Sequence, residues 1–287
     1  MKISVIDVGS NSVRLATMAD GKTLYKRMNT TRLGEGLSQS GLISAEAAER
    51  TAQAVADFHA QAIEEGAQKV YIFATAAVRS AQNRNDFLER VKNLCGAEVE
   101  VVSGETEAQI GILGALGNSD GGIIDVGGAS TEVILKKDGK TVYSKSVNMG
   151  AVRLFDAAGR DKDKLLKIIS EKVEEFGNFF AQGFNVCAIG GTATRLAAIK
   201  HNLKEYRPEI SHGTTFTADE LSVFADKLLN TPVEQISANT ICGKSSELVG
   251  GGALLLQAVM QRFEIKEIAV SENDNLEGFY ILKEGVK

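Results

Sequence analysis

The sequence predicts an α/β protein built from two related halves. Short runs rich in β-branched residues alternate with amphipathic helical stretches, which is typical of the α/β class. The segment Ile6–Ser12 (IDVGSNS) returns 118 residues later as Ile124–Thr131 (IDVGGAST). Each copy begins at the end of a strand and leads into two further strands joined by an Asp-Gly turn. At about 100–200 residues per domain, the 287 residues therefore predict domains at 1–118 and 119–287.

Hydrophobic patterning in the first half predicts three strands followed by alternating helices and strands. Ser44 is a suitable N-cap for the first long helix, and Val55, Phe58 and Ala62 fall on one face of it. The expected order is strands at 2–6, 12–18 and 23–28, a helix at 44–65, a strand at 69–74, a helix at 85–94, a strand at 98–102 and a helix at 103–117.

The second half starts with the same three-strand pattern. Its longest helix, at 161–182, has an apolar stripe formed by Leu166, Ile169, Val173, Phe176 and Phe180. Three consecutive glycines, Gly250–Gly252, lie inside a predicted helix, where they cost stability and indicate close packing or the approach of a ligand. The expected order is strands at 122–126, 131–136 and 141–147, a helix at 161–182, a strand at 184–189, helices at 192–200, 217–230 (with a capping box) and 245–263, a strand at 266–270 and a helix to 282.

Composition excludes several classes of protein. A net charge of −5 and a pI of about 5.4 argue against a nucleic-acid-binding protein. Cys95, Cys187 and Cys242 are far apart and form no CxxC pair. They predict neither a disulfide framework nor a zinc site but buried small side chains in a reducing compartment. The N-terminus does not resemble a signal peptide, and no apolar run approaches the roughly 20 residues of a membrane span. We therefore expect a cytoplasmic protein without a membrane partner.

The repeated motif has the chemistry of a phosphate loop. A strand that ends in Asp before a Gly-rich turn exposes backbone N–H groups and lets a phosphate approach them. Ser and Thr hydroxyls add contacts, and the Asp can hold Mg²⁺. One such turn is more often structural, but two copies with matching flanks predict a pair of loops that clamp one polyanion. A third glycine turn, Ile189–Thr192, opens a helix and is either an anion site or a plain strand-to-helix turn.

Five segments of the chain form a recognisable set: Asp7–Ser12, Arg32–Leu37, Ala74–Arg79, Ser103–Ala108 and Ile124–Glu132. Together they resemble the exopolyphosphatase and guanosine pentaphosphate phosphatase family, within the acetate and sugar kinase, heat-shock-70 and actin superfamily. The second half matches more loosely, through Gly190–Thr192 and Gly250–Ala253. The resemblance implies two duplicated actin-like (ribonuclease H-like) domains with a central cleft.

The resemblance also implies roles for individual residues. Glu107 matches the general base that activates water, and Arg79 matches a phosphate-facing arginine. Asp125 and Glu132, joined by Asp7, match acids that organise Mg²⁺ or another divalent cation. The implied phosphate-binding residues are Ser10, Asn11, Ser12, Gly127, Gly128, Ser130, Gly190, Gly191 and Thr192.

From the residues alone, alternatives stay open for three of these side chains. Glu105 competes with Glu107 as the base, and either could lie on a solvated helix face. Without the resemblance, Glu132 reads as an exposed strand carboxylate and Arg79 as a surface loop cation.

The chain departs from the family pattern at three places. Ala129 stands where the family usually has a third glycine, and it would restrict the loop if φ had to be positive. Leu276 stands where an Arg usually precedes Glu-Gly, and Ser245-Ser246-Glu247 replaces an Arg-Ala-Asp. These changes weaken a basic patch in the second domain and bear on chain-length preference and activity. The chain also lacks the C-terminal helical extension of longer members, which predicts a limited track for long polyphosphate.

The preferred interpretation is a metal-dependent hydrolase that releases terminal phosphate from inorganic polyphosphate. A guanosine pentaphosphate 5′-phosphatase uses the same machinery, with a base pocket near 190–195 and Gly250. Two further alternatives are a kinase that transfers phosphate from ATP to a small acceptor, and a non-catalytic sensor of polyphosphate or guanosine tetraphosphate. No nucleic-acid partner is expected, and the long amphipathic helices are compatible with a homodimer without assigning an interface.

Overall fold

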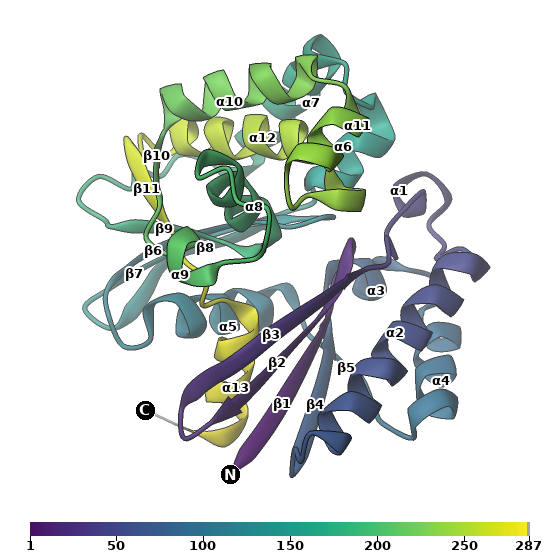
Figure 1. The fold of residues 1–287 in the computed structure, drawn as a ribbon. Coiled ribbons are helices and arrows are strands. Elements are labelled where there is room, and N and C mark those ends of the chain that lie inside the picture. The colour runs from purple at the N-terminus through teal and green to yellow at the C-terminus, as the bar shows by residue number, and fades with distance from the viewer. Residues whose placement is uncertain (286–287) are drawn as a thin grey trace. The chain divides into compact units, whose positions relative to one another are not determined.

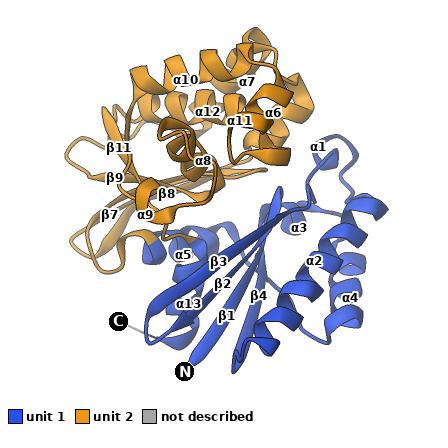
Figure 2. Cartoon of the chain, in the orientation of Figure 1, with its two compact units in different colours: residues 1–114, 275–287 blue, residues 115–274 orange. Residues whose placement is uncertain are grey.

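The computed structural model describes residues 1–285 and contains two compact units (Figure 2). Unit 1 consists of Met1–Gly114 and the C-terminal segment from Asn275, and unit 2 of Ala115–Asp274. The boundary lies close to the one predicted at residue 118, but the C-terminal segment belongs to unit 1 and not to the second domain. Residues 286 and 287, which the second predicted domain includes, lie outside the described residues.

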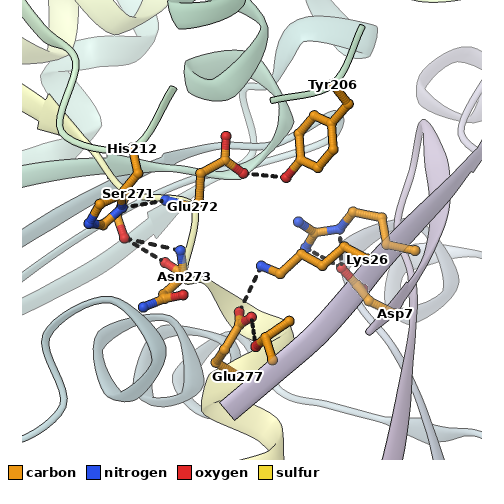
Figure 3. Close-up of polar contacts among 10 residues, drawn as sticks. Asp7, Lys26, Tyr206, His212, Ser271, Glu272, Asn273 and Glu277 are labelled. Atoms are coloured by element: carbon orange, nitrogen blue, oxygen red, sulfur yellow. Dashed lines mark hydrogen bonds and ion pairs between the residues drawn. The ribbon is translucent and has the colours of Figure 1, made fainter. Parts of the chain in front are cut away.

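Side-chain packing explains why the last helix, α13 (Asn275–Glu284), joins unit 1. Phe279 stacks on Phe73 of the first sheet with 4.5 Å between the ring centroids. The buried carboxylate of Glu277 pairs with Lys26 Nζ at 2.9 Å and accepts a hydrogen bond from Thr23 Oγ1 at 2.7 Å (Figure 3). These contacts connect residues more than 200 positions apart in sequence, which local patterning cannot reveal.

Unit 1 is built on a five-stranded sheet in the order β3-β2-β1-β4-β5. The first three strands are antiparallel, and β4 and β5 run parallel to β1. Successive residues of β1 face opposite sides of the sheet, so Ile6 packs with α2 and α4 whereas Val5 packs with α5 and α13 (Figure 1). The strands are β1 (Lys2–Val8), β2 (Ser12–Ala19), β3 (Lys22–Thr30), β4 (Lys69–Ala74) and β5 (Glu100–Val101).

The helices of unit 1 follow the prediction, with two short additions. Ser44 is the N-cap of α2, where its Oγ accepts a hydrogen bond from the Ala47 N–H at 3.2 Å. The sequence did not predict the short helices α1 and α3, and the strand predicted at 98–102 is reduced to β5. The helices are α1 (Leu37–Ser40), α2 (Ala45–Glu64), α3 (Ala76–Ser80), α4 (Arg84–Cys95) and α5 (Gly104–Leu116).

Unit 2 repeats the arrangement of the first sheet. Its order is β10-β11-β9-β6-β7-β8, so β8-β7-β6-β9-β11 corresponds to β3-β2-β1-β4-β5 and β10 is an added edge strand. The predicted duplication of an α/β, ribonuclease H-like domain is therefore confirmed at the level of topology. The strands are β6 (Gly121–Val126), β7 (Thr131–Lys137), β8 (Lys140–Val147), β9 (Val186–Ile189), β10 (Thr215–Thr217) and β11 (Glu267–Val270).

The helices of unit 2 include several that the sequence did not predict, among them α6, α9 and α11. The capping box of α10 is confirmed, because Thr217 and Glu220 exchange both of its hydrogen bonds. The helices are α6 (Ala151–Ala158), α7 (Lys162–Val173), the 3₁₀ turn η1 (Glu174–Phe176), α8 (Gly190–Lys200), α9 (Pro208–Ser211), α10 (Ala218–Asn230), α11 (Val233–Asn239), the 3₁₀ turn η2 (Gly243–Ser245) and α12 (Val249–Arg262).

The long helix predicted at 161–182 is wrong in length and in part of its apolar stripe. It ends with η1 because Gly177 adopts a left-handed φ of 75°, which terminates the helix. Leu166 is 41% exposed and Phe180 is 57% exposed, whereas the neighbouring Leu165 is fully buried. The stripe therefore starts one residue earlier than predicted, and the segment after Gly177 is not helical.

The turn that leaves unit 2 after β11 is held by its own side chains and by neighbours within that unit (Figure 3). Ser271 Oγ donates to the Asn273 carbonyl at 2.9 Å and accepts from the Asn273 N–H at 3.2 Å. The Glu272 N–H donates to His212 Nδ1 at 3.2 Å, and the Tyr206 hydroxyl donates to the Glu272 carboxylate. The chain therefore leaves unit 2 from a well-defined conformation.

Two remaining sequence predictions concern the cysteines and membranes. All three cysteines are free thiols, but only Cys242 is buried, and Cys95 and Cys187 are partly exposed. Within residues 1–285, no helix combines the length and hydropathy that a membrane span requires.

The three glycines of α12 make different contacts, which gives a stability prediction. A Cβ on Gly252 would lie 2.7 Å from Thr192 Cγ2, whereas a Cβ on Gly251 would meet Leu165 at an ordinary 3.7 Å. We expect Gly252→Ala to lower the free energy of unfolding by about 1–3 kcal/mol through overpacking. Gly251→Ala should raise it by about 0.5–1 kcal/mol, because alanine favours the helix. Urea denaturation measures both, and equal shifts in the two variants would contradict this account.

Candidate active site

The first predicted phosphate loop joins β1 to β2 and is closed by a hydrogen bond from the Gly9 N–H to the Ser12 carbonyl at 3.0 Å. The carbonyls of Ser10 and Asn11 accept hydrogen bonds from the segment that follows β3. The Gly34 N–H donates to the Ser10 carbonyl at 2.8 Å, and the Arg32 N–H donates to the Asn11 carbonyl at 2.9 Å. The Arg32–Leu37 motif, which the sequence singled out without a role, therefore holds this loop in place.

The second loop repeats this construction. The Gly127 N–H donates to the Ser130 carbonyl at 3.0 Å, as in the first loop. The Val152 N–H at the start of α6 donates to the Gly128 carbonyl at 2.9 Å, which matches the Gly34–Ser10 bond at the same 118-residue spacing. The Ala151 N–H also donates to the Gly127 carbonyl at 2.9 Å, so the start of α6 holds the second loop.

The sequence analysis missed the segment that closes the second loop. A Cβ on Gly150 would lie 2.5 Å from the Gly128 carbonyl carbon, so this position needs a glycine for close approach. Arg153 donates from Nε to the Ala129 carbonyl at 2.8 Å. The sequence contained a signal for this segment, because the residue 118 positions after Gly34 is Val152.

Ala129 does not strain its loop. It is 3% exposed, and it is not among the five non-glycine residues with positive φ in the described chain, which all lie elsewhere. The conformation at this position is therefore open to any small residue, and the departure from the family's glycine leaves the loop geometry intact.

Glu107 lies in the first turn of α5 and is 7% exposed. Arg79 Nη1 donates to Glu107 Oε2 at 2.8 Å and to the Val102 carbonyl at 3.0 Å. Glu105, the other candidate base, is exposed to solvent. The two carboxylates that the sequence could not separate therefore differ in environment.

The groups around Glu107 shift the pKa of its carboxyl. Burial raises the pKa of its carboxyl, the hydrogen bond and positive charge of Arg79 oppose this, and the negative charge of Asp7 adds to the rise. The net pKa is above the ordinary value. Thr75, directly before α3, also donates a side-chain hydrogen bond to this carboxylate, a contact that the sequence analysis missed.

Asp7 and Asp125 occupy equivalent strand ends but have different partners. Asp7 faces Arg14 across β1 and β2, and Arg14 Nε donates to Asp7 Oδ2 at 3.0 Å. Asp125 faces Glu132 across β6 and β7. Because directly opposed residues of an antiparallel pair point to the same face, unit 1 pairs a carboxylate with a cation and unit 2 pairs two carboxylates.

The Asp125–Glu132 pair has the chemistry of a divalent-cation site. The two side chains are 8% and 2% exposed, so their like charges are poorly screened. Ser146 Oγ donates to Glu132 Oε1 at 2.5 Å and so helps to orient it. Among residues 1–285 there is no group of three or more His, Cys, Asp and Glu side chains arranged to hold a metal. A cation here would complete its shell with water and phosphate oxygens, as Mg²⁺ commonly does.

The third glycine turn lies beside Asp125 at the start of α8. Gly190 has a φ of 79°, and a Cβ there would overlap Asp125 Oδ1, so only glycine fits. The Thr192 hydroxyl donates to the Val126 carbonyl at 2.7 Å, and the Gly191 carbonyl accepts from the buried Arg195 Nη1 at 2.9 Å. The turn is therefore tied to the end of β6, directly before the second loop.

Curated proteins with similar sequences are phosphatases by name. The chain is 26% identical to a bifunctional 3-dehydroquinate synthase/phosphatase of Fusobacterium nucleatum, over 98% of this chain but only 46% of that protein. It is 27% identical to exopolyphosphatase 2 of Mycobacterium tuberculosis, over 96% and 97% of the two chains. It is 26% identical to a guanosine-5'-triphosphate,3'-diphosphate pyrophosphatase of Vibrio campbellii, of which it spans 58%.

A solved structure agrees with these relatives. The crystal structure of the Aquifex aeolicus Ppx/GppA family member is 27% identical to this chain, with a TM-score of 0.78 over 100% of this chain and 99% of the other. The family model described as the Ppx/GppA phosphatase family matches residues 13–285. This match covers most of both units, and the chain belongs to the Ppx/GppA phosphatase family.

Proposed function

We propose that this protein is a metal-dependent phosphoanhydride hydrolase that releases terminal phosphate from inorganic polyphosphate. The observation that carries the proposal is Glu107, a buried carboxylate with a raised pKa in the unit that holds the first phosphate loop. A buried acid whose pKa moves toward the working pH is suited to accept a proton from water.

In the proposed reaction, a water oxygen attacks the terminal phosphorus while Glu107 accepts the water proton. The bridging P–O bond breaks, releasing orthophosphate and a chain shorter by one unit. Arg79 favours the ionised form of Glu107 through its 2.8 Å hydrogen bond. Its partly exposed guanidinium also offers positive charge to a phosphoryl oxygen.

The phosphate loops hold the substrate in this proposal. The carbonyls of Ser10, Asn11, Gly127 and Gly128 are engaged by neighbouring segments of their own unit. The loops therefore present fixed N–H groups and the hydroxyls of Ser10 and Ser130 without reorganising. Fixed donors of this kind stabilise developing negative charge at little cost.

Mg²⁺ or another divalent cation is proposed to bind at Asp125 and Glu132. When bound, it would neutralise charge on the phosphates that approach the second loop. Asp7, which the resemblance added to the metal ligands, already pairs with Arg14, so we assign the cation to the carboxylate pair of unit 2.

We propose polyphosphate over guanosine pentaphosphate because side chains pack closely against the glycine run, part of the region suggested for a base pocket. A Cβ added to Gly250 would lie 2.8 Å from the Leu229 side chain, and a Cβ added to Gly252 would lie 2.7 Å from the Thr192 side chain. The glycine run therefore serves close packing between helices, one of the two roles that its sequence suggested. Leu276, in the position of the family's arginine, is 1% exposed in the apolar core of unit 1.

Phosphate release from polyphosphate of defined length, with Mg²⁺ and with EDTA, tests the proposal. Metal-dependent release supports the hydrolase, and faster release from guanosine pentaphosphate in a parallel assay would overturn the substrate assignment. Release only after a small-molecule acceptor is added with ATP would indicate a kinase. Tight polyphosphate binding without release would indicate a sensor.

We further propose that the protein works in the cytoplasm, which its three free thiols support. A homodimer is the proposed assembly, since long amphipathic helices such as α10 leave Val223 exposed. Sedimentation analysis would show the mass of the particle, and a monomer at all concentrations would exclude the dimer.

The environment of Glu107 predicts a pH dependence. Because its pKa is raised, kcat/KM should fall on the acidic side at a pH above the ordinary glutamate range, where the base becomes protonated. Arg79 lowers this pKa, so Arg79→Gln should move the acidic limb to higher pH, whatever its effect on the maximal rate. A pH–rate profile measures the shift. A limb that stays in place or moves to lower pH would contradict the role of Glu107 as the base.

A further inference from the structure

Arg153 is a cation at the second phosphate loop to which neither the motifs nor the resemblance gave a role. Its backbone N–H donates to the Gly128 carbonyl at 3.2 Å, and its side-chain Nε donates to the Ala129 carbonyl at 2.8 Å. The charged head of Arg153 therefore lies against the loop that carries Gly127, Gly128 and Ser130.

Within residues 1–285, the two terminal nitrogens of this guanidinium have no protein acceptor. In this described part of the chain, the side chain of Arg153 forms a hydrogen bond through Nε alone, to the Ala129 carbonyl. Burial lowers the pKa of Arg153, while the charge of Asp156 on the same helix opposes this fall. A partly desolvated guanidinium whose Nη1 and Nη2 atoms are available is well suited to bind two oxygens of one phosphate.

The repeat shows that closing a loop does not require an arginine. The residue 118 positions earlier is Glu35, next to Gly34, whose N–H closes the first loop in the same way. The side chain of Glu35 is 58% accessible and forms a long ion pair with Arg32 at 3.9 Å. Backbone hydrogen bonds are thus sufficient to hold the first loop, and at this position of the repeat only unit 2 carries a positive charge.

We infer that Arg153 binds a phosphoryl group of the substrate through its terminal nitrogens, while Nε fixes the guanidinium on the Ala129 carbonyl. The inference rests on the proposed function, since it assigns the ligand as the polyphosphate that the second loop holds. It makes Arg153 a substrate-binding residue that adds to the backbone donors of the loop.

Calorimetric titration of the full-length chain with tripolyphosphate and Mg²⁺ tests this role. The titration is done in a Glu107→Gln background, so that turnover does not consume the ligand. Arg153→Gln should weaken binding by about 10–100-fold, the range for a lost charge-assisted hydrogen bond. Arg153→Lys should retain much of the affinity, because it keeps the charge. Lys167→Gln removes an exposed charge of α7 in the same unit and should leave the affinity unchanged.

Ionic strength separates substrate binding from a purely structural role. If Arg153 contacts phosphate, the difference in affinity between the Arg153→Gln and Lys167→Gln variants should narrow as salt rises, because salt screens the charge. Equal, salt-independent losses in Arg153→Gln and Arg153→Lys would overturn the inference and leave Arg153 as a loop support. Unaltered affinity in Arg153→Gln would also overturn it. If the Glu107→Gln parent does not bind tripolyphosphate and the unmodified protein releases no phosphate, the proposed function itself fails.

Discussion

Glu107→Gln is expected to lower the turnover of polyphosphate hydrolysis by about 10²–10⁴-fold, the range that general-base catalysis supplies. Glutamine has nearly the same shape but cannot accept the proton of water. Phosphate release at saturating substrate measures the loss, and unfolding by heat confirms that the variant is folded. The fold should survive, because a neutral side chain replaces a buried charge that is costly to keep ionised.

Glu105→Gln is the matched control for this prediction. Glu105 lies in the same first turn of α5 and loses the same charge, but its side chain is exposed. It should retain nearly full turnover. Similar losses in the two variants would point to the charge of the helix start rather than to a specific base, and an active Glu107→Gln variant would remove Glu107 from the mechanism.

Asp125→Asn is expected to raise the Mg²⁺ concentration needed for half-maximal activity by at least about 10–100-fold, the range known even for partners of metal ligands. Removing one of two facing carboxylates halves the negative charge that attracts the cation. Mg²⁺ titrations of phosphate release measure the effect. Asparagine keeps the size of the side chain that lies against Gly190, where an added Cβ would overlap Asp125 Oδ1.

Asp7→Asn is the equivalent change in unit 1 and should give a different result. Asp7 pairs with Arg14, so its loss should leave the Mg²⁺ requirement nearly unchanged. It should instead move the acidic limb of the pH–rate profile to lower pH, because the charge of Asp7 raises the pKa of Glu107. A large rise in the Mg²⁺ concentration that Asp7→Asn needs for half-maximal activity would indicate that Asp7 is a metal ligand.

Much of the backbone arrangement around the candidate site was predictable, because it is built from local chain segments. The two loops follow strands whose patterning is clear, and their sequences repeat at a spacing of 118 residues. The structure gives both loops the same closing hydrogen bond and both sheets the same strand order. The segment after the third strand was harder to recognise, because Arg32–Leu37 and Gly150–Phe155 share a role but few residues. That role depends on backbone hydrogen bonds, which place few demands on side-chain identity.

The sequence by itself determined the α/β class, the duplicated arrangement of strands, the two loops and the set of acidic and basic residues available for chemistry. These follow from hydrophobic period, turn residues and repetition, all of which are local. Only the tertiary structure decided which carboxylate is buried, which acid pairs with a cation, and which unit receives the last helix. Glu107 differs from Glu105 because it is buried against Arg79. Asp125 differs from Asp7 because it faces Glu132 across the sheet. Helix α13 is held in unit 1 by its contacts with Phe73 and Lys26. Each of these depends on residues distant in sequence, because burial and charge pairing are properties of the packed chain.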